Sequence, residues 1–234
     1  IRDREECVEA MRLLARLHGD LTFTPVFPEV EGVPAPVIDR YLPSRDYEKH
    51  NRELKRARRF LKQRSQKTWF EIRLSAVIDP FLEEARQLSE EWKEIETTAG
   101  NRGEEPMCFC HGDYQYHNIL RQDRGFFLVN FEKCQADGPV RDLYLLLRKL
   151  LEKCEWDTEW GRVLLAAYES VRPLKPYERQ DLFYRLSYPE KLWKIVNFYY
   201  NSGKAWIPEK NQEKLDRLLE QEAARKKFLK MLQK

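Results

Sequence analysis

The stretch from Cys110 to Leu120 carries residues whose types and spacing could do chemistry. His111, Asp113 and Asn118 stand in the order His-x-Asp-x-x-x-x-Asn within one polar segment. In phosphoryl transfer a carboxylate orients the attacking hydroxyl, and side-chain oxygens hold the metal ions that bridge the phosphates. Asp113 fits the first task and Asn118 fits the second, so the stretch is typical of a phosphotransferase catalytic loop.

A second polar group follows the apolar run 126–129. A metal site of this kind normally adds an Asp at the end of the strand after the loop, and here that position is Asn130. An amide offers Mg²⁺ a neutral oxygen without a charge, so we expect weaker binding of the ion. Glu132 would share a face with Asn130 in a strand and is a candidate replacement. The predicted metal and cofactor ligands are therefore Asn118, Asn130 and Glu132.

The loop needs a rigid support, and the flanking residues predict one. The apolar run 107–110 indicates a short strand, a second strand begins at Asn118, and a turn at 123–125 leads into a third. The catalytic-loop hairpin is thus predicted over 107–132, with the site on a loop carried by strands.

Upstream, helical periodicity and capping residues predict a first helix over 1–18, and five prolines then interrupt a loop over 19–45. His18 closes the helix on its apolar face, where a packed structural histidine is the commoner role and a site residue the alternative. A helical insert over 46–98 follows. Its first helix is basic, which indicates either a solvated face or a docking surface for an acidic partner. Pro80 is expected to kink or split the second helix.

After the hairpin, a helical subdomain is predicted over 139–234. Asp142 lies in the first turn of its first helix, over 139–153, and further helices are expected over 158–171, 176–187, 190–201 and 211–233. From Arg172 onward Lys and Arg outnumber Asp and Glu by fifteen to eight. Aromatic residues here fit either a core or a ligand pocket, and Lys204 and Trp206 are candidate substrate or partner contacts.

The composition argues against several classes of protein. The formal net charge of +3 is too small to indicate specific nucleic-acid binding, and no apolar run approaches the roughly 20 residues that span a bilayer. The five cysteines form no Cys-x-x-Cys motif and no Cys/His cluster with zinc spacing, which predicts reduced, mostly buried thiols. The sequence predicts an intracellular chain.

The loop resembles that of the aminoglycoside phosphotransferase and choline kinase branch of the protein-kinase-like fold. More narrowly, the chain is similar to the CotS family of spore coat proteins. The narrower resemblance is carried by 111–120, 129–132, Asp142-Leu143-Tyr144 with Arg148-Lys149, 185–191 and 199–207.

This resemblance implies a mainly α-helical fold with a small β-hairpin sheet, the C-terminal lobe of the kinase-like fold. It also implies that Asp142 accepts hydrogen bonds from the loop backbone, whereas the simpler interpretation is a carboxylate favoured near a helix N-terminus. Nothing before the loop resembles a Gly-rich turn over phosphates or a strand with a phosphate-pairing Lys. We therefore expect a fragment without its N-terminal lobe, inactive and without a cofactor, whereas the full-length protein would use ATP and Mg²⁺.

Three functional hypotheses follow. The first is a CotS-type spore coat protein with degenerate or weak catalysis, made in the mother-cell cytoplasm and assembled into the coat with other coat proteins. The second is an ATP- and Mg²⁺-dependent kinase of a small-molecule hydroxyl, with Asp113 as base and with His111 and Asp142 in the catalytic set. The third is a module that binds nucleotide without transferring phosphate. The basic C-terminal half disfavours a polycationic aminoglycoside substrate.

Overall fold

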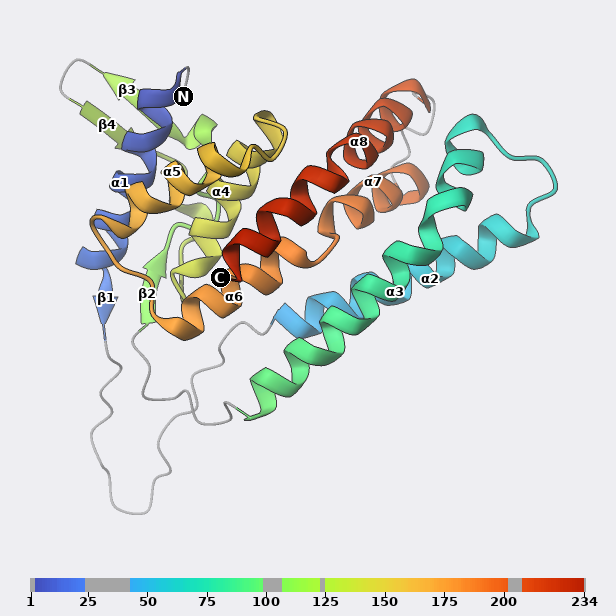
Figure 1. Cartoon of the computed structure of the whole chain (residues 1–234), viewed down its shortest axis with the longest axis horizontal. Helices are drawn as coiled ribbons and strands as arrows, with labels where there is room; N and C mark the ends of the chain where they lie inside the picture. The colour runs from blue at the N-terminus through green and yellow to red at the C-terminus, as the bar shows by residue number, and fades with distance from the viewer. Residues whose placement is uncertain (1–2, 24–42, 99–106, 123–124, 202–207, 234) are drawn as a thin grey trace. The chain divides into compact units, whose positions relative to one another are not determined.

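The computed structural model describes residues 3–23, 43–98, 107–122, 125–201 and 208–233. Helices dominate, and the strands form two small antiparallel sheets (Figure 1). This confirms the predicted fold class, with two small sheets instead of one. The chain divides into two compact units, which are described separately below.

The first unit is built from Ile1–Tyr41, Gly100–Arg185 and Ala224–Lys234. Three of its helices pack on one another, and the first of them also contacts the central strand of a sheet. These elements are α1 (Arg4–Asp20), α4 (Val140–Lys153), α5 (Thr158–Glu169), β1 (Thr22–Phe23), β2 (Met107–Cys110) and β5 (Gln135–Asp137). The second sheet is the hairpin of β3 (Ile119–Gln122) and β4 (Gly125–Leu128).

The strand pairing differs from the sequence prediction in one respect. β2 is the middle strand of the order β1-β2-β5, with Cys108 opposite both Thr22 and Asp137. The predicted first strand therefore belongs to a different sheet from the hairpin. Asn118 ends a short 3₁₀ turn, η2 (Tyr116–Asn118), and β3 begins one residue later.

The start of α1 follows its capping residues. The Asp3 side chain accepts a hydrogen bond of 2.9 Å from the Glu6 backbone N–H. The Glu6 side chain binds Arg121 of β3, with 2.6 Å between Oε1 and Nη1. The helix ends at Asp20, beyond the predicted end at residue 18, and the Leu21 N–H after it still donates to the Leu17 carbonyl at 3.0 Å.

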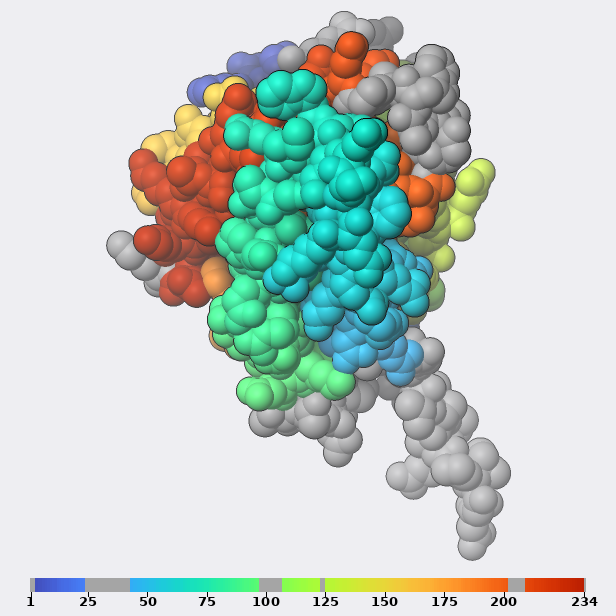
Figure 2. All heavy atoms as spheres, turned by 90° about the vertical axis from the view of Figure 1, so that its right-hand side faces the viewer, coloured from blue at the N-terminus to red at the C-terminus, as the bar shows by residue number. Residues whose placement is uncertain are grey.

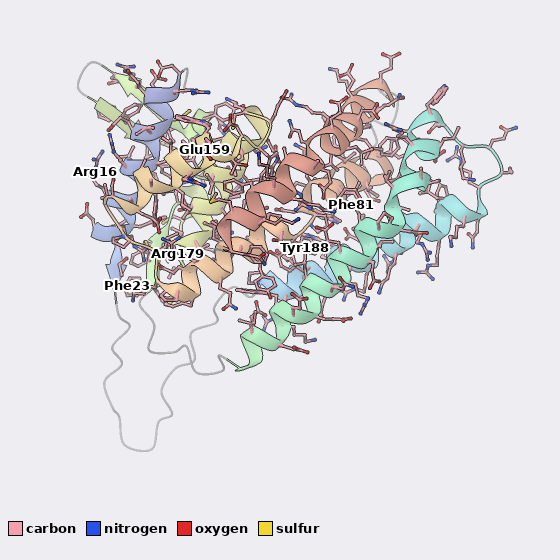
Figure 3. The ribbon with its side chains drawn as sticks, viewed as in Figure 1. Arg16, Phe23, Phe81, Glu159, Arg179 and Tyr188 are labelled. Atoms are coloured by element: carbon pink, nitrogen blue, oxygen red, sulfur yellow. The ribbon has the colours of Figure 1, made fainter. Side chains whose placement is uncertain are left out.

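The second unit comprises Leu42–Ala99 and Leu186–Ala223. α2 (Pro43–Gln63) lies beside α3 (Trp69–Thr98), and both run along the face seen in Figure 2. α7 (Glu190–Asn201) packs on α2. Phe81 and Tyr188, labelled in Figure 3, are both buried in this unit.

α3 begins at a capping box formed by Thr68 and Glu71. The Thr68 N–H donates to Glu71 Oε2 at 2.8 Å, and the Glu71 N–H donates to Thr68 Oγ1 at 3.3 Å. The helix is not split at Pro80. A proline inside a helix removes one backbone hydrogen bond, and burial of Ile78 and Phe81 on either side offsets that loss.

The remaining helices agree closely with the sequence pattern. α6 (Pro176–Ser187) and α7 have the predicted bounds, whereas α8 runs over Pro208–Leu232 and begins before the predicted residue 211. α5 ends at Glu169, short of the predicted residue 171. Proline at a helix start explains α6 and α8, because the missing N–H would have no partner within the helix there.

Candidate functional site

The Asp142 carboxylate holds the backbone of the loop. Its Oδ2 accepts a hydrogen bond of 2.5 Å from the His111 N–H, and its Oδ1 accepts one of 2.9 Å from the Gly112 N–H. Asp142 is fully buried in the first turn of α4. This is the contact that the family resemblance implied, and the position near a helix N-terminus favours the same charge.

His111 braces the loop from the other side. Its Nδ1 accepts from the Asp113 N–H at 3.2 Å, so its Nε2 carries the proton and donates to the Val129 carbonyl at 2.9 Å. The ring is fully buried and packs against Phe131, with 4.6 Å between ring centroids. His111 therefore ties the loop to the chain that follows β4.

Gly112 is required by geometry. Its φ of +77° lies in the left-handed region, and a Cβ at this position would stand 2.1 Å from the Lys133 carbonyl oxygen. No L side chain fits so close to a backbone atom. The glycine thus lets the loop approach the segment that carries Lys133.

Asp113, the predicted base, is 22% exposed, and both of its carboxylate oxygens have partners. Gln115 Nε2 donates to Oδ1, and Lys133 Nζ donates to Oδ2 at 2.9 Å. The hydrogen bond from Lys133 is the main cause that lowers the pKa of Asp113 below its ordinary value. The carboxylate is ionised at neutral pH, and the contact with Lys133 makes it a weaker base toward a hydroxyl proton.

Asn118 and Asn130 are brought together by the structure. Asn130 Nδ2 donates to Asn118 Oδ1 at 2.8 Å, and Asn118 Nδ2 donates to the Asp113 carbonyl at 2.8 Å. Asn118 is 1% exposed, and Asn130 adopts the left-handed conformation with φ of 67°, which Asn tolerates better than most residues. The oxygen predicted to bind a metal thus accepts a hydrogen bond from a neighbouring amide.

Glu132 does not share a strand face with Asn130, contrary to the prediction. β4 ends at Leu128, and Glu132 lies in the 3₁₀ turn η3 (Phe131–Lys133) on an exposed position. Side chains two residues apart share a face only in an extended strand. Asn118, Asn130 and Glu132 therefore present one charged oxygen ligand, in a solvated turn, which is a poor fit to Mg²⁺.

Lys204 and Trp206, the candidate substrate or partner contacts, lie outside the described residues. Of the aromatic residues near them, Trp193 and Tyr200 line a cavity of about 280 Å³ in the second unit, together with Glu53 and Phe60. Trp193 Nε1 donates to Glu53 Oε2 at 2.6 Å. Trp193 and Tyr200 thus fit the ligand-pocket interpretation, whereas Tyr188 is buried in the core.

The basic helix α2 keeps most of its cations on the surface. Arg58 pairs with Asp79 of α3 at the surface, which fits the solvated-face interpretation, since exposed ion pairs add little stability. Arg64, just after the end of α2, instead lies with its Nη1 3.0 Å from Oε1 of the buried Glu71. None of the described helices is both long enough and apolar enough to cross a membrane.

The structure also shows a group that the sequence spacing did not reveal. All five cysteines are free, but only Cys108 and Cys110 are fully buried and Cys134 is exposed, so the expectation of mostly buried thiols is only partly met. Cys108 and Cys110 lie close to His18. Spacing along the chain could not reveal this group, because His18 is 90 residues from Cys108.

Comparison with solved structures defines the class of fold. An aminoglycoside phosphotransferase from Alicyclobacillus acidocaldarius subsp. acidocaldarius DSM 446 matches with a TM-score of 0.78 and 18% identity, covering 99% of this chain and 66% of that chain. With a loop held as described above, the chain has the kinase-like fold of the aminoglycoside phosphotransferases. Its residues 83–232 match the family described as spore coat putative kinase YutH, and the chain belongs to that family.

A curated relative supports the same assignment. Spore coat protein S of Bacillus subtilis (strain 168) is 32% identical over 123 residues, which are 52% of this chain. The chain covers only 35% of that relative's length. The family and its kinase-like, CotS-type fold are thus established for this segment.

The Asp142 contact predicts a specific loss on substitution. In Asp142→Asn the side-chain NH₂ group would face one of the two backbone N–H groups. That buried N–H would lose its acceptor, so the unfolding free energy should fall by roughly 3 kcal/mol. Hydrogen exchange should show faster exchange of the His111 and Gly112 amides. Asp157→Asn is the control, since Asn caps the exposed start of α5 as well as Asp. Unchanged protection of the two loop amides would contradict this role.

The Lys133 contact predicts a change in titration. Because the folded pKa of Asp113 is depressed, the ion pair stabilises the fold above the unfolded pKa and is lost as pH falls through the folded pKa. Lys133→Ala should raise the pKa of Asp113, read from its carboxyl carbon by NMR. Lys153→Ala, which removes a lysine over the Tyr116 ring, should leave that pKa in place. Equal pKa values in the Lys133 variant and the wild type would show that the contact is absent in solution.

Proposed function

We propose that this chain is the kinase-like part of a CotS-type spore coat protein whose catalysis is weak or absent and whose role is in coat assembly. The observation that carries the proposal is the hydrogen bond from Asn130 to Asn118, at 2.8 Å. It lies where the catalysis would require a metal ion.

The chemistry of that pair explains why the metal site is weakened. An Asp at position 130 would place a charged oxygen opposite Asn118 Oδ1, and two facing oxygens favour a shared cation. Asn130 instead supplies an amide N–H, whose partial positive charge interacts with Asn118 Oδ1. A cation would have to break this hydrogen bond and would gain no negatively charged ligand.

The state of Asp113 supports the same proposal. Its carboxylate is held by Lys133 and Gln115, which favour the ionised form and occupy both oxygens. A base in this position is weakened, because the ion pair with Lys133 favours its ionised form. Both groups needed for transfer are therefore engaged with other side chains.

The role in the coat is supported by the relatives. The matched family is described as a spore coat putative kinase, and the curated relative is named spore coat protein S. We infer that this chain shares their location in the coat and contacts other coat proteins there.

One observation favours an active phosphotransferase as the alternative. Asp142 fixes the backbone of His111 and Gly112 with two short hydrogen bonds, and Asp113 is partly exposed on that fixed loop. With ATP and Mg²⁺ supplied to the full-length protein, Asp113 would then orient an acceptor hydroxyl. The third possibility, a module that binds nucleotide without transferring phosphate, would require ATP binding but not the action of Asp113 on a hydroxyl.

Calorimetric titration with Mg²⁺ and ATP distinguishes these proposals. The wild-type chain should show weak Mg²⁺ binding and no ATP turnover, whereas Asn130→Asp should bind Mg²⁺ at least about tenfold more tightly, a gain of roughly 1.4 kcal/mol. Asp tolerates the left-handed backbone as Asn does, so the fold should persist.

Asn130→Ala is the matched control, because it removes the amide without adding a charge and should not gain affinity. The same measurements on the full-length protein should agree. ATP turnover in the full-length wild type that Asp113→Ala abolishes would refute degenerate catalysis.

A further inference from the structure

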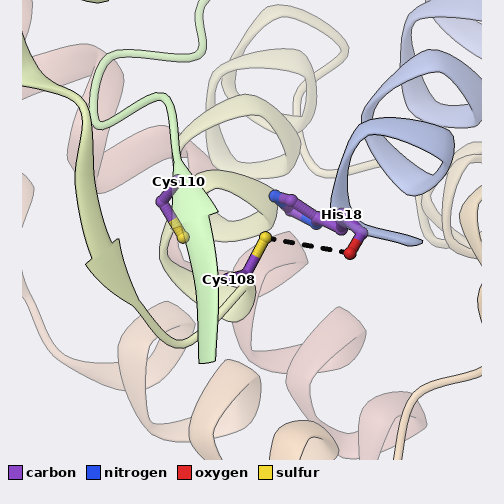
Figure 4. Close-up of side chains that lie close together, drawn as sticks. All are labelled: His18, Cys108 and Cys110. Carbon is purple, nitrogen blue, oxygen red and sulfur yellow. Dashed lines mark hydrogen bonds between the residues drawn. The ribbon is translucent and has the colours of Figure 1, made fainter. Parts of the chain in front are cut away.

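Three chemically reactive side chains meet in the interior of the first unit. A ring nitrogen of His18, Cys108 Sγ and Cys110 Sγ all lie within 4.8 Å of one another. Figure 4 shows the His18 ring, from the end of α1, extending toward the two cysteines of β2. All three residues are 0% exposed.

The two nitrogens of His18 have different surroundings. Nδ1 lies 2.8 Å from the Tyr168 hydroxyl. Nε2 is buried and has no hydrogen-bond partner among the described residues. Asp142 Oδ2 is 3.7 Å away, beyond hydrogen-bond distance. A buried polar atom without a partner is unusual and calls for an explanation.

The two cysteines have a shared orientation. They are two residues apart on a strand, so their side chains point to the same face. Cys108 Sγ lies 3.8 Å from the His18 carbonyl, and Cys110 Sγ lies 3.4 Å from the Gly138 carbonyl. Thiols are weak donors, so these contacts bind the sulfurs loosely. Packed structural thiols would account for both sulfurs but not for His18 Nε2.

We propose that His18 Nε2, Cys108 Sγ and Cys110 Sγ bind one Zn²⁺ ion. Ideal Zn–S bonds of about 2.3 Å and Zn–N bonds of about 2.0 Å would place the three ligand atoms roughly 3.5–3.8 Å apart, which is within the observed limit of 4.8 Å. Tyr168 would then hold the other ring nitrogen, the usual arrangement for a metal-bound histidine.

Charge balance selects the ion. Both thiols release their protons to solvent on binding, and the two thiolates neutralise a divalent cation. The buried group is then neutral, which avoids the large cost of an unpaired charge in the interior. The neighbouring Asp142 carboxylate adds attraction for a cation. A zinc ion here would join α1 to β2 next to the carboxylate that holds the loop.

Metal analysis and cobalt spectroscopy on the reduced chain test the proposal. After dialysis against Zn²⁺ the wild type should retain about one ion per chain. Co²⁺ should produce thiolate-to-cobalt charge-transfer absorption. Cys110→Ser should weaken Zn²⁺ binding by more than the roughly 10- to 100-fold that loss of an outer partner costs. Cys134→Ser is the matched control, because this cysteine is exposed and should leave binding unchanged.

The cobalt absorption of the wild type tests the proposal even if Cys110→Ser does not fold. Absence of the charge-transfer absorption in the wild type would overturn the proposal. Zinc affinity equal in the wild type and Cys110→Ser, or lost in Cys134→Ser, would also overturn it, since the ion would then be bound elsewhere.

Discussion

The buried Asp142 carboxylate is the interaction on which the loop depends. Its two oxygens accept the backbone N–H groups of His111 and Gly112, and without it two buried donors would lack partners. The carboxylate is in the first turn of α4 and beside the end of α1, since His18 Nε2 is 3.7 Å from Oδ2. The shape of the loop is thus fixed by helix packing and does not require a ligand.

This constraint separates the shape of the loop from its chemistry. The fixed backbone would position Asp113 for transfer, while Asn130 donates a hydrogen bond to Asn118 Oδ1, the contact that we propose in place of a metal ion. Lys133 meanwhile holds the predicted base. We propose that such a chain keeps a well-ordered loop although its affinity for Mg²⁺ is low, because different interactions determine the two properties.

Much of the fold could be predicted from local signals. The Thr68 and Glu71 capping box and the bounds of α6 and α7 follow from residues next to them in sequence. The contacts that define the site could not be predicted from such local signals. The Asn130 side chain was expected on a strand, but its left-handed backbone turned it toward Asn118. The His18 cluster joins residues far apart in the chain, and neither case has a periodic pattern to reveal it.

The central claim is that an amide hydrogen bond replaces the metal ion at the loop. Paramagnetic broadening by Mn²⁺ in the presence of ATP tests it most directly, observed on the side-chain amide signals of Asn118 and Asn130. The bond predicts that both signals persist with unchanged width at Mn²⁺ concentrations that saturate ATP. Selective broadening of these two signals, with others unaffected, would place the ion between the two residues and contradict the account.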